Sequence, residues 1–253
     1  MLLRRLYEYT VLYGGLLLFA VICLVWSLIA TLLYPLLPKR IGTPLGQFAI
    51  MAGFRLYLDI LRLSGIVKLD LSALDQLRHE RALIIAPNHP SMIDVVLIAS
   101  RLPRLVCIMK ASIWDNLLLG GGARLAGYIR NDAPVNMVRL AAEAVRNGTP
   151  LLIFPEGTRT VSPPVNDFKA GYGLIAKKAG APIQSVFIDT NCRFLGKGWP
   201  LFKRPEFPLY YRIELGARFE PTEDVKHLIG DMETYYRQQP SIKNIFRETT
   251  TQP

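Results

Sequence analysis

The spacing of apolar residues divides the chain into two parts with different patterns. Residues 11–37 contain no charged side chain over 27 positions, and a helix needs about 20 apolar residues to cross the hydrocarbon core of a bilayer. From residue 66 onward the apolar runs are short and recur with helical stretches between them. We therefore predict membrane-anchoring helices over residues 1–65 and a globular domain after them.

Positive residues flank both ends of the apolar run, so the charge distribution leaves its orientation open. These residues are Arg4, Arg5, Lys39 and Arg40. The run either spans the bilayer or enters and leaves it on one side, with glycines and prolines as candidate bends: Gly14, Gly15, Pro35 and Pro38. A cleaved signal peptide fits less well, because the run is too long and no small-residue cleavage site follows it.

Residues 44–64 predict an amphipathic helix, because apolar side chains recur at spacings of three and four. The residues of this apolar face are Leu45, Phe48, Ala52, Leu56 and Ile60. Such a helix lies in the bilayer interface or packs on the protein core, and the pattern fits both.

The remaining pattern predicts strands and helices in alternation. Strands are expected at 66–71, 82–87, 105–109, 151–154, 183–188 and 209–216, and helices at 91–101, 136–147 and 222–238. Alternation of this kind is typical of an α/β fold, here a mixed, mostly parallel sheet flanked by helices. We expect this catalytic domain over residues 66–220 and a C-terminal helix and tail over 221–253. Gly120-Gly121-Gly122 is interpreted as a flexible turn.

The net charge of +10 and the 51% apolar content limit the classes of binding partner that we expect. Basic side chains lie next to apolar and aromatic ones, as in Arg193–Tyr211, which favours an anionic membrane surface. No nucleic-acid-binding motif is present in the sequence, so nucleic acid is not an expected partner. The three cysteines show no paired spacing, and neither a disulfide framework nor a metal site is expected.

The first candidate block, residues 88–94, follows the strand predicted at 82–87 and opens a helix. In α/β folds, chemistry gathers at the carboxyl ends of strands. A turn before the helix can bring His89 back onto Asp94, so that the carboxylate orients the imidazole as a general base. In the alternative interpretation, Ser91 and Asp94 form an ordinary helix-capping pattern.

The second block, residues 154–160, also follows a predicted strand. Gly157 permits close approach of the backbone to a ligand. Thr158 offers a hydroxyl, Arg159 a planar fork that suits phosphate, and Glu156 an acceptor for a substrate hydroxyl. The alternative is a tight turn with a surface ion pair between Glu156 and Arg159.

Together the two blocks resemble the glycerolipid acyltransferase family, which includes 1-acylglycerol-3-phosphate acyltransferases. The family signature is N-H-x-S-x-x-D, followed about sixty residues later by F-P-E-G-T-R. It is matched by residues 88–94 and 154–159. The resemblance covers roughly residues 66–220 and implies that His89 and Asp94 are catalytic. It further implies substrate contacts from these positions: Asn88, Ser91, Glu156, Gly157, Thr158 and Arg159.

By this resemblance, the histidine deprotonates an acceptor hydroxyl, which attacks the thioester of acyl-CoA or of an acyl carrier protein. The implied acceptor is a lyso-lipid of the membrane, without a cofactor. The implied location is the bacterial inner membrane, with the active site at the cytoplasmic face.

Two departures from the family pattern bear on the acceptor. The family's middle block ends in an arginine where this chain has Ala133, and Arg130 is the candidate substitute. The fourth block has lost its second proline at Ser185. Residues 109–129 also resemble acyltransferases of aryl-polyene pathways. Alternative functions are therefore the same chemistry on another lipid or on an aryl-polyene acceptor, hydrolysis of the thioester, and lipid binding without catalysis.

Overall fold

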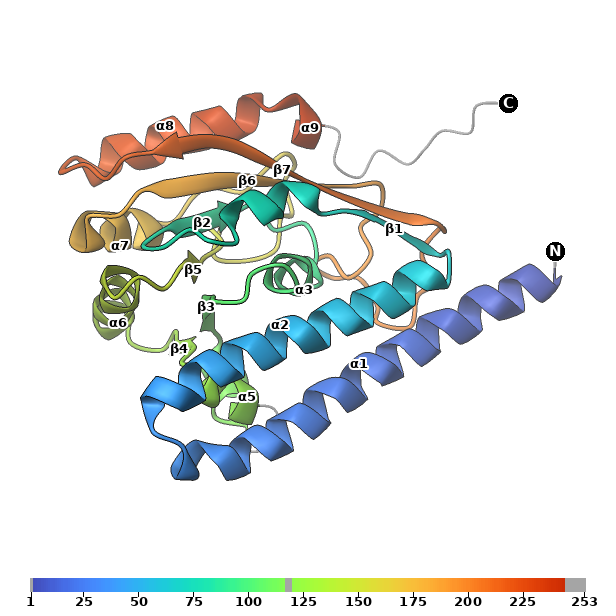
Figure 1. Ribbon diagram of the computed structural model, residues 1–253. Coiled ribbons are helices and arrows are strands. Elements are labelled where there is room, and N and C mark those ends of the chain that lie inside the picture. Colours follow the sequence, from blue (N-terminus) through green and yellow to red (C-terminus); the bar gives the residue numbers. More distant parts are fainter. Residues whose placement is uncertain (1, 117–119, 244–253) are drawn as a thin grey trace.

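Residues 2–116 and 120–243, which the computed structural model describes, contain one sheet of seven strands (Figure 1). The strands are β1 (Val67–Asp70), β2 (Ile84–Pro87), β3 (Val106–Met109), β4 (Ile129–Arg130), β5 (Leu151–Leu152), β6 (Ile183–Thr190) and β7 (Leu209–Phe219). Their order is β1-β7-β6-β2-β5-β3-β4. Only the β6–β7 pair of this sheet is antiparallel. The prediction of a mixed, mostly parallel sheet is confirmed.

Helices cover both faces of the sheet (Figure 1). On one face lie α1 (Leu2–Leu36), α2 (Lys39–Leu63), η1 (Ser72–Leu77), α3 (Asp94–Ala99) and α5 (Gly120–Leu125). On the other lie α6 (Pro134–Arg146), α7 (Gly171–Ala179), α8 (Val225–Gln238) and α9 (Pro240–Lys243). The short α4 (Ala111–Trp114) follows β3.

The strands contribute apolar side chains to both helix layers, because successive side chains of a strand point to opposite faces of the sheet. Ile84 packs with α6, α7 and α8, whereas Ile85 packs with α2 and α3. Leu151 and Leu152 alternate in the same way. Both faces are therefore apolar, as a covered parallel sheet requires.

The apolar N-terminal run is one continuous helix that continues through Gly14, Gly15 and Pro35. The chain reverses around Pro38, which precedes the first turn of α2. Helices α1 and α2 therefore lie side by side as a hairpin along the domain (Figure 1). Among the candidate bends, Pro38 alone falls at the reversal.

Helix α2 uses a different face for packing than the one that its apolar pattern suggested. Leu45, Phe48, Leu56 and Ile60 are all exposed. The buried face carries two glycines, which admit neighbouring backbone, and larger side chains: Gly42, Gly46, Gln47, Met51, Tyr57, Leu58 and Leu61. The helix thus packs on the core and also presents an apolar surface to the outside.

The interpretation of Gly120-Gly121-Gly122 as a flexible turn is wrong, because these residues begin helix α5. Glycine is a poor helix former, but here its lack of a side chain permits close packing. A Cβ atom on Gly121 would clash with Thr31 and with the Ser27 carbonyl of α1. Tertiary contact between α1 and α5 therefore overrides the local preference.

Replacing Gly121 with valine should force α1 and α5 apart. Overpacking of this kind costs about 1–3 kcal/mol, so we expect the melting temperature in detergent to fall by several degrees. Gly14→Ala is the matched control, because no atom lies within 4 Å of a Cβ there. Equal melting temperatures for the two variants would contradict the packing described.

Candidate active site

The two sequence blocks meet at one edge of the sheet. Block 88–94 follows β2 and block 154–160 follows β5, and these parallel strands are neighbours. Strand β6 flanks β2 on its other side and leads into the segment 191–208. Three adjacent carboxyl ends therefore supply the walls of the site.

A short hydrogen bond joins His89 and Asp94. The imidazole Nδ1 lies 2.8 Å from Asp94 Oδ2, which also accepts from the Ser91 backbone N–H at 2.8 Å. The Asp94 side chain is fully buried, and that of His89 is 15% exposed. The second ring nitrogen, Nε2, has no hydrogen-bond partner in the described part of the chain and is left for a substrate.

The local backbone explains why residues five apart meet. Residues 91–93 form a turn, and α3 begins only at Asp94. Ile93, and not Ser91, immediately precedes α3, but the capping bond from the Ser91 N–H to the Asp94 side chain is formed. The Asp94 carboxylate closes the turn by accepting from Ser91 and orients the imidazole with the same oxygen.

Residues of block 154–160 contact both the ring and the backbone of His89. The Phe154 ring stacks on the imidazole with centroids 3.8 Å apart and planes 20° from parallel. The backbone of His89 donates to Glu156 Oε1 at 2.9 Å and accepts from the Thr160 N–H at 2.7 Å. Phe154 is thus a positioning residue that spacing alone had not singled out, although it stands inside the quoted motif.

Glu156 connects three segments. Oε1 accepts from the Thr160 hydroxyl as well as from His89, and Oε2 accepts from the Asn166 N–H at 2.8 Å. The side chain is only 1% exposed. Burial raises the pKa of Glu156, and these hydrogen bonds oppose the rise. By these bonds Glu156 holds His89, Thr160 and Asn166 together, while its contact with a substrate hydroxyl stays a prediction.

Asn88 and Ser91 face the protein. The Asn88 amide bonds to both the N–H and the carbonyl of Ile188 on β6. The Ser91 hydroxyl donates to the Phe194 carbonyl at 2.7 Å. Both residues are fully buried, so these bonds hold the walls of the site together. Substrate contact by either residue stays a prediction.

The segment around Phe194 is held from both blocks. Arg159 Nη1 donates to the carbonyls of Leu195 and Gly196, at 2.8 and 3.0 Å. The Met92 N–H also donates to Leu195. The Arg159 fork is thus used in part by the protein, and the surface pair with Glu156 does not form. Gly157 has a φ of +66°, and the neighbouring Thr158 is exposed, so that substrate contact by either residue stays a prediction.

Arg130 lies apart from this cluster, at the end of β4. Three strand spacings separate β4 from β2, about 14 Å at 4.7–4.9 Å each. Its guanidinium pairs with Asp115 at 2.9 Å and Asp132 at 3.0 Å. The structure therefore brings Arg130 to the same edge of the sheet, but with its charge already matched by two carboxylates.

The electrostatics of the dyad follow from burial. Desolvation raises the pKa of Asp94, and the hydrogen bonds from His89 and Ser91 oppose the rise. Asp94 Oδ1 and the nearby Tyr211 hydroxyl are both buried without a hydrogen-bond partner. Groups of three or more metal-binding side chains do not occur within residues 2–116 and 120–243.

Comparisons with known sequences find similarity to acyltransferases. Residues 68–189 match the family model described as Acyltransferase. A chloroplastic 1-acyl-sn-glycerol-3-phosphate acyltransferase of Brassica napus is 28% identical over 137 residues, 52% of this chain and 40% of the relative. A probable 1-acyl-sn-glycerol-3-phosphate acyltransferase of Mycoplasma pneumoniae is 29% identical over 121 residues, 43% and 45%. The chain thus spans less than half the length of the curated relatives it matches.

A solved structure shows the same fold. The crystal structure of the 1-acyl-sn-glycerophosphate (LPA) acyltransferase PlsC from Thermotoga maritima superposes with a TM-score of 0.67. The superposition covers 94% of this chain and 93% of the other, at 19% sequence identity. The likeness includes the N-terminal helices as well as the sheet, because it extends over nearly the whole chain.

Proposed function

We propose that the protein transfers a fatty acyl group from a thioester to a lipid hydroxyl, because residues 68–189 match the family model described as Acyltransferase. The acceptor that we propose is a lyso-glycerolipid such as 1-acylglycerol-3-phosphate. The observation that carries this proposal is the His89–Asp94 hydrogen bond at the meeting point of the two blocks. The names of both curated relatives support the acceptor.

In the reaction that this geometry supports, His89 Nε2 takes the proton from the acceptor hydroxyl as the oxygen attacks the thioester carbonyl. The buried Asp94 carboxylate stabilises the imidazolium that forms. The carbon–sulfur bond then breaks, an ester remains, and the thiolate receives the proton from His89. No covalent acyl-enzyme is needed, because the acceptor oxygen itself is the nucleophile.

The donor is acyl-CoA or an acyl carrier protein, since both present the same thioester. An apolar pocket of about 30 Å³ adjoins the dyad and is bordered by Ile93, Phe194 and Tyr211, with α1 and α2 on its far side. We assign this pocket to the beginning of the acyl chain.

The acceptor is the less constrained partner. A phosphate needs an unpaired cation, and the Arg130 charge is already matched by Asp115 and Asp132. An acceptor other than 1-acylglycerol-3-phosphate, such as an aryl-polyene hydroxyl, therefore stays the alternative.

Lipid mass spectrometry of cells with and without the gene tests the proposed acyl transfer. Loss of a diacyl lipid with accumulation of its lyso form supports it, and an unchanged lipid profile contradicts it.

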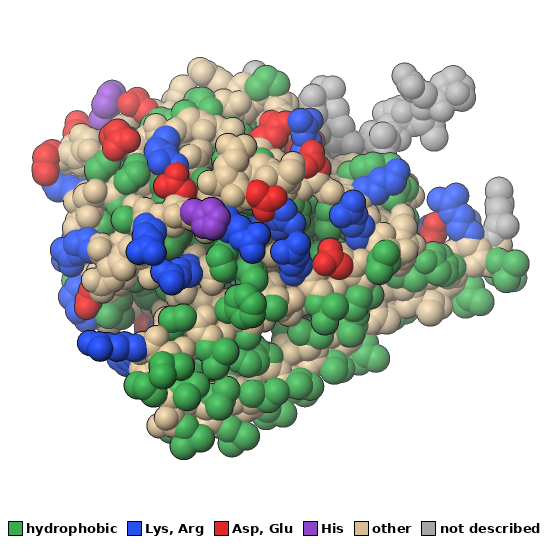
Figure 2. Space-filling view, in the orientation of Figure 1, with side chains coloured by type: hydrophobic (Ala, Val, Ile, Leu, Met, Phe, Trp, Pro, Cys, Tyr) green, Lys and Arg blue, Asp and Glu red, His purple; other side chains and the backbone are tan. Residues whose placement is uncertain are grey.

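We further propose that the N-terminal hairpin anchors the protein at a membrane. Helix α1 is long and apolar enough to cross a bilayer, yet it has buried residues toward both ends: Glu8, Leu12 and Gly15 toward one, and Ser27 and Ala30 toward the other. A helix of 35 residues is about 52 Å long, and a crossing would draw the attached domain into the hydrocarbon. We therefore propose that the hairpin lies in one leaflet, with its exposed apolar face toward the hydrocarbon core of the bilayer. Figure 2 shows hydrophobic side chains gathered over this part of the molecule.

The segment 193–208 lies beside α1 and adds to this surface. The Tyr13 hydroxyl donates to the Phe202 carbonyl at 3.2 Å, and the two rings lie 6.1 Å apart. The Phe202 side chain is 69% exposed, and the Lys203 ammonium lies 4.9 Å above the Trp199 ring. These residues suit the boundary between headgroups and acyl chains. We place the protein at the bacterial inner membrane, with the site facing the cytoplasm.

Replacing Trp199 and Phe202 with serine should weaken binding to anionic vesicles by about tenfold or more, because burying each large apolar side chain contributes about 1.5–3 kcal/mol. Sedimentation with vesicles measures the effect. Leu174→Ser is the control, since this exposed leucine lies on α7, on the other face of the sheet. Unchanged sedimentation of the double variant would refute the contact.

A further inference from the structure

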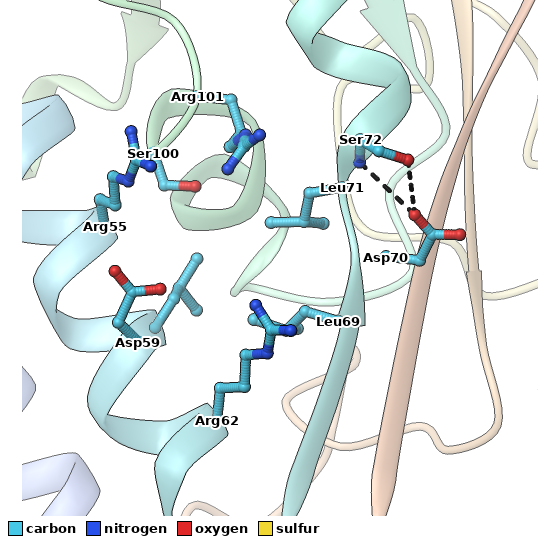
Figure 3. Close-up of a pocket in the computed structure, with 10 residues that line it drawn as sticks. Arg55, Asp59, Arg62, Leu69, Asp70, Leu71, Ser72, Ser100 and Arg101 are labelled. Atoms are coloured by element: carbon cyan, nitrogen blue, oxygen red, sulfur yellow. Dashed lines mark hydrogen bonds between the residues drawn. The ribbon is translucent and has the colours of Figure 1, made fainter.

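A cavity of about 280 Å³ lies outside the active site, between α2, β1 and the C-terminal end of α3 (Figure 3). Its polar lining comes from Arg55, Asp59 and Arg62 on α2, from Asp70 and Ser72 around the end of β1, and from Ser100 and Arg101 after α3. Helix α3 runs from the catalytic Asp94 at one end to this cavity at the other. The cavity therefore has no part in the chemistry at His89.

Two of its three arginines are unpaired. Within residues 2–116 and 120–243, neither Arg55 nor Arg62 makes an ion pair or a side-chain hydrogen bond. Arg101, in contrast, is held by Asp75, with its Nε 3.0 Å from the carboxylate. Two unmatched guanidinium groups at one cavity attract an anion, and their planar forks suit phosphate oxygens.

The acidic residues of the cavity do not pair with Arg55 or Arg62. Asp59 stands between Arg55 and Arg62 on the same helix but pairs with neither. Asp70 also lines the cavity, but its carboxylate accepts from the Ser72 hydroxyl at 2.8 Å (Figure 3) and pairs with Arg212 at 3.8 Å. The cavity thus offers cationic groups and one free acceptor, a combination that fits a phosphate carrying a hydroxyl or ammonium donor.

The cavity also adjoins the apolar surface. On α2, Leu56, Ile60 and Leu63 are each one residue beyond a polar lining residue, and they are 57%, 40% and 87% exposed. Figure 2 shows lysine and arginine side chains in a band along the edge of the hydrophobic area. With the hairpin in one leaflet, this band lies at the depth of the headgroups.

We propose that this cavity binds the headgroup of an anionic membrane phospholipid. Arg55 and Arg62 hold the phosphate, Asp59 accepts from a headgroup hydroxyl or ammonium, and the acyl chains run beside Leu56 and Ile60. The site fixes how the domain sits on the bilayer. It depends on the membrane placement of the hairpin, and not on acyl transfer.

The test uses the full chain and vesicles of phosphatidylcholine with or without phosphatidylglycerol. R55A/R62A should bind phosphatidylglycerol vesicles about 30-fold more weakly, from about fivefold for each arginine at an anionic surface. R146A/K178A is the matched control, because it removes the same charge from exposed positions on α6 and α7. All three proteins should bind pure phosphatidylcholine vesicles equally.

Three outcomes would overturn the proposal. One is an equal loss in R55A/R62A and R146A/K178A, which means general attraction without a site. Another is displacement from phosphatidylglycerol vesicles by excess inorganic phosphate at constant ionic strength, which means a site for free phosphate. The last is loss of acyl transfer to detergent-solubilised substrates by R55A/R62A, since this variant should keep wild-type activity there.

Discussion

Replacement of His89 with alanine is expected to lower the rate of acyl transfer by about 100- to 10,000-fold, the usual contribution of a positioned general base. The imidazole is the group that can take the acceptor proton, because its Nδ1 is bound to Asp94 and its Nε2 is left for the substrate. Release of the free thiol from acyl-CoA, followed with a chromogenic disulfide, measures the loss.

The chain provides its own control for this variant. His227 and Asp231 form a second histidine–aspartate pair on α8, with Nε2 3.2 Å from the carboxylate and the His227 side chain 74% exposed. His227→Ala should keep full activity. Circular dichroism should show the same helix content in both variants, and undiminished thiol release by His89→Ala would remove the mechanism.

Replacement of Asp94 with asparagine is the second large expected effect. Asparagine keeps the size of the side chain but not the charge that stabilises the imidazolium, so we expect a rate loss of about 100- to 10,000-fold. Burial raises the pKa of Asp94 in the folded protein. The native state therefore binds the proton more tightly than the unfolded state, and the ionised carboxylate destabilises the fold as the pH rises through that pKa.

Asp94→Asn should consequently lose activity without losing stability. At neutral pH its melting temperature should equal or exceed that of the wild type, and this difference should shrink as the pH falls below the pKa of Asp94. Asp231→Asn should change neither property. An Asp94→Asn variant that unfolds more easily but keeps the wild-type rate per folded molecule would show that Asp94 serves the fold, and not the reaction.

The meeting of the two blocks was predictable because parallel neighbouring strands bring their carboxyl ends to one edge. What each side chain does there was not. Sequence spacing cannot tell whether the Ser91 hydroxyl turns toward a substrate or toward the Phe194 carbonyl, which lies 103 residues away. The same holds for Asn88 and β6. Contacts of this range depend on the packed fold, and no local pattern encodes them.

The N-terminal helices show the same limit at the level of packing. Apolar spacing identified α2 but named the face that is exposed, since two glycines and Gln47 interrupt the large side chains of the buried face. The Gln47 amide donates to the Ala126 carbonyl at 3.1 Å, and a Cβ atom on Gly46 would lie 2.7 Å from the Ala126 nitrogen. Close backbone approach, and not hydrophobicity, selected these residues.

Identification of the product is the sharpest test of acyl transfer at the His89–Asp94 site. Purified protein in lipid vesicles is given labelled acyl-CoA with 1-acylglycerol-3-phosphate, and the labelled product is identified by mass spectrometry. We expect a new diacyl lipid, formed with one equivalent of free thiol and absent with His89→Ala. Labelled free fatty acid in its place would show a thioesterase. Absence of turnover across a panel of lyso-lipids, with both CoA and carrier-protein donors, would contradict the account.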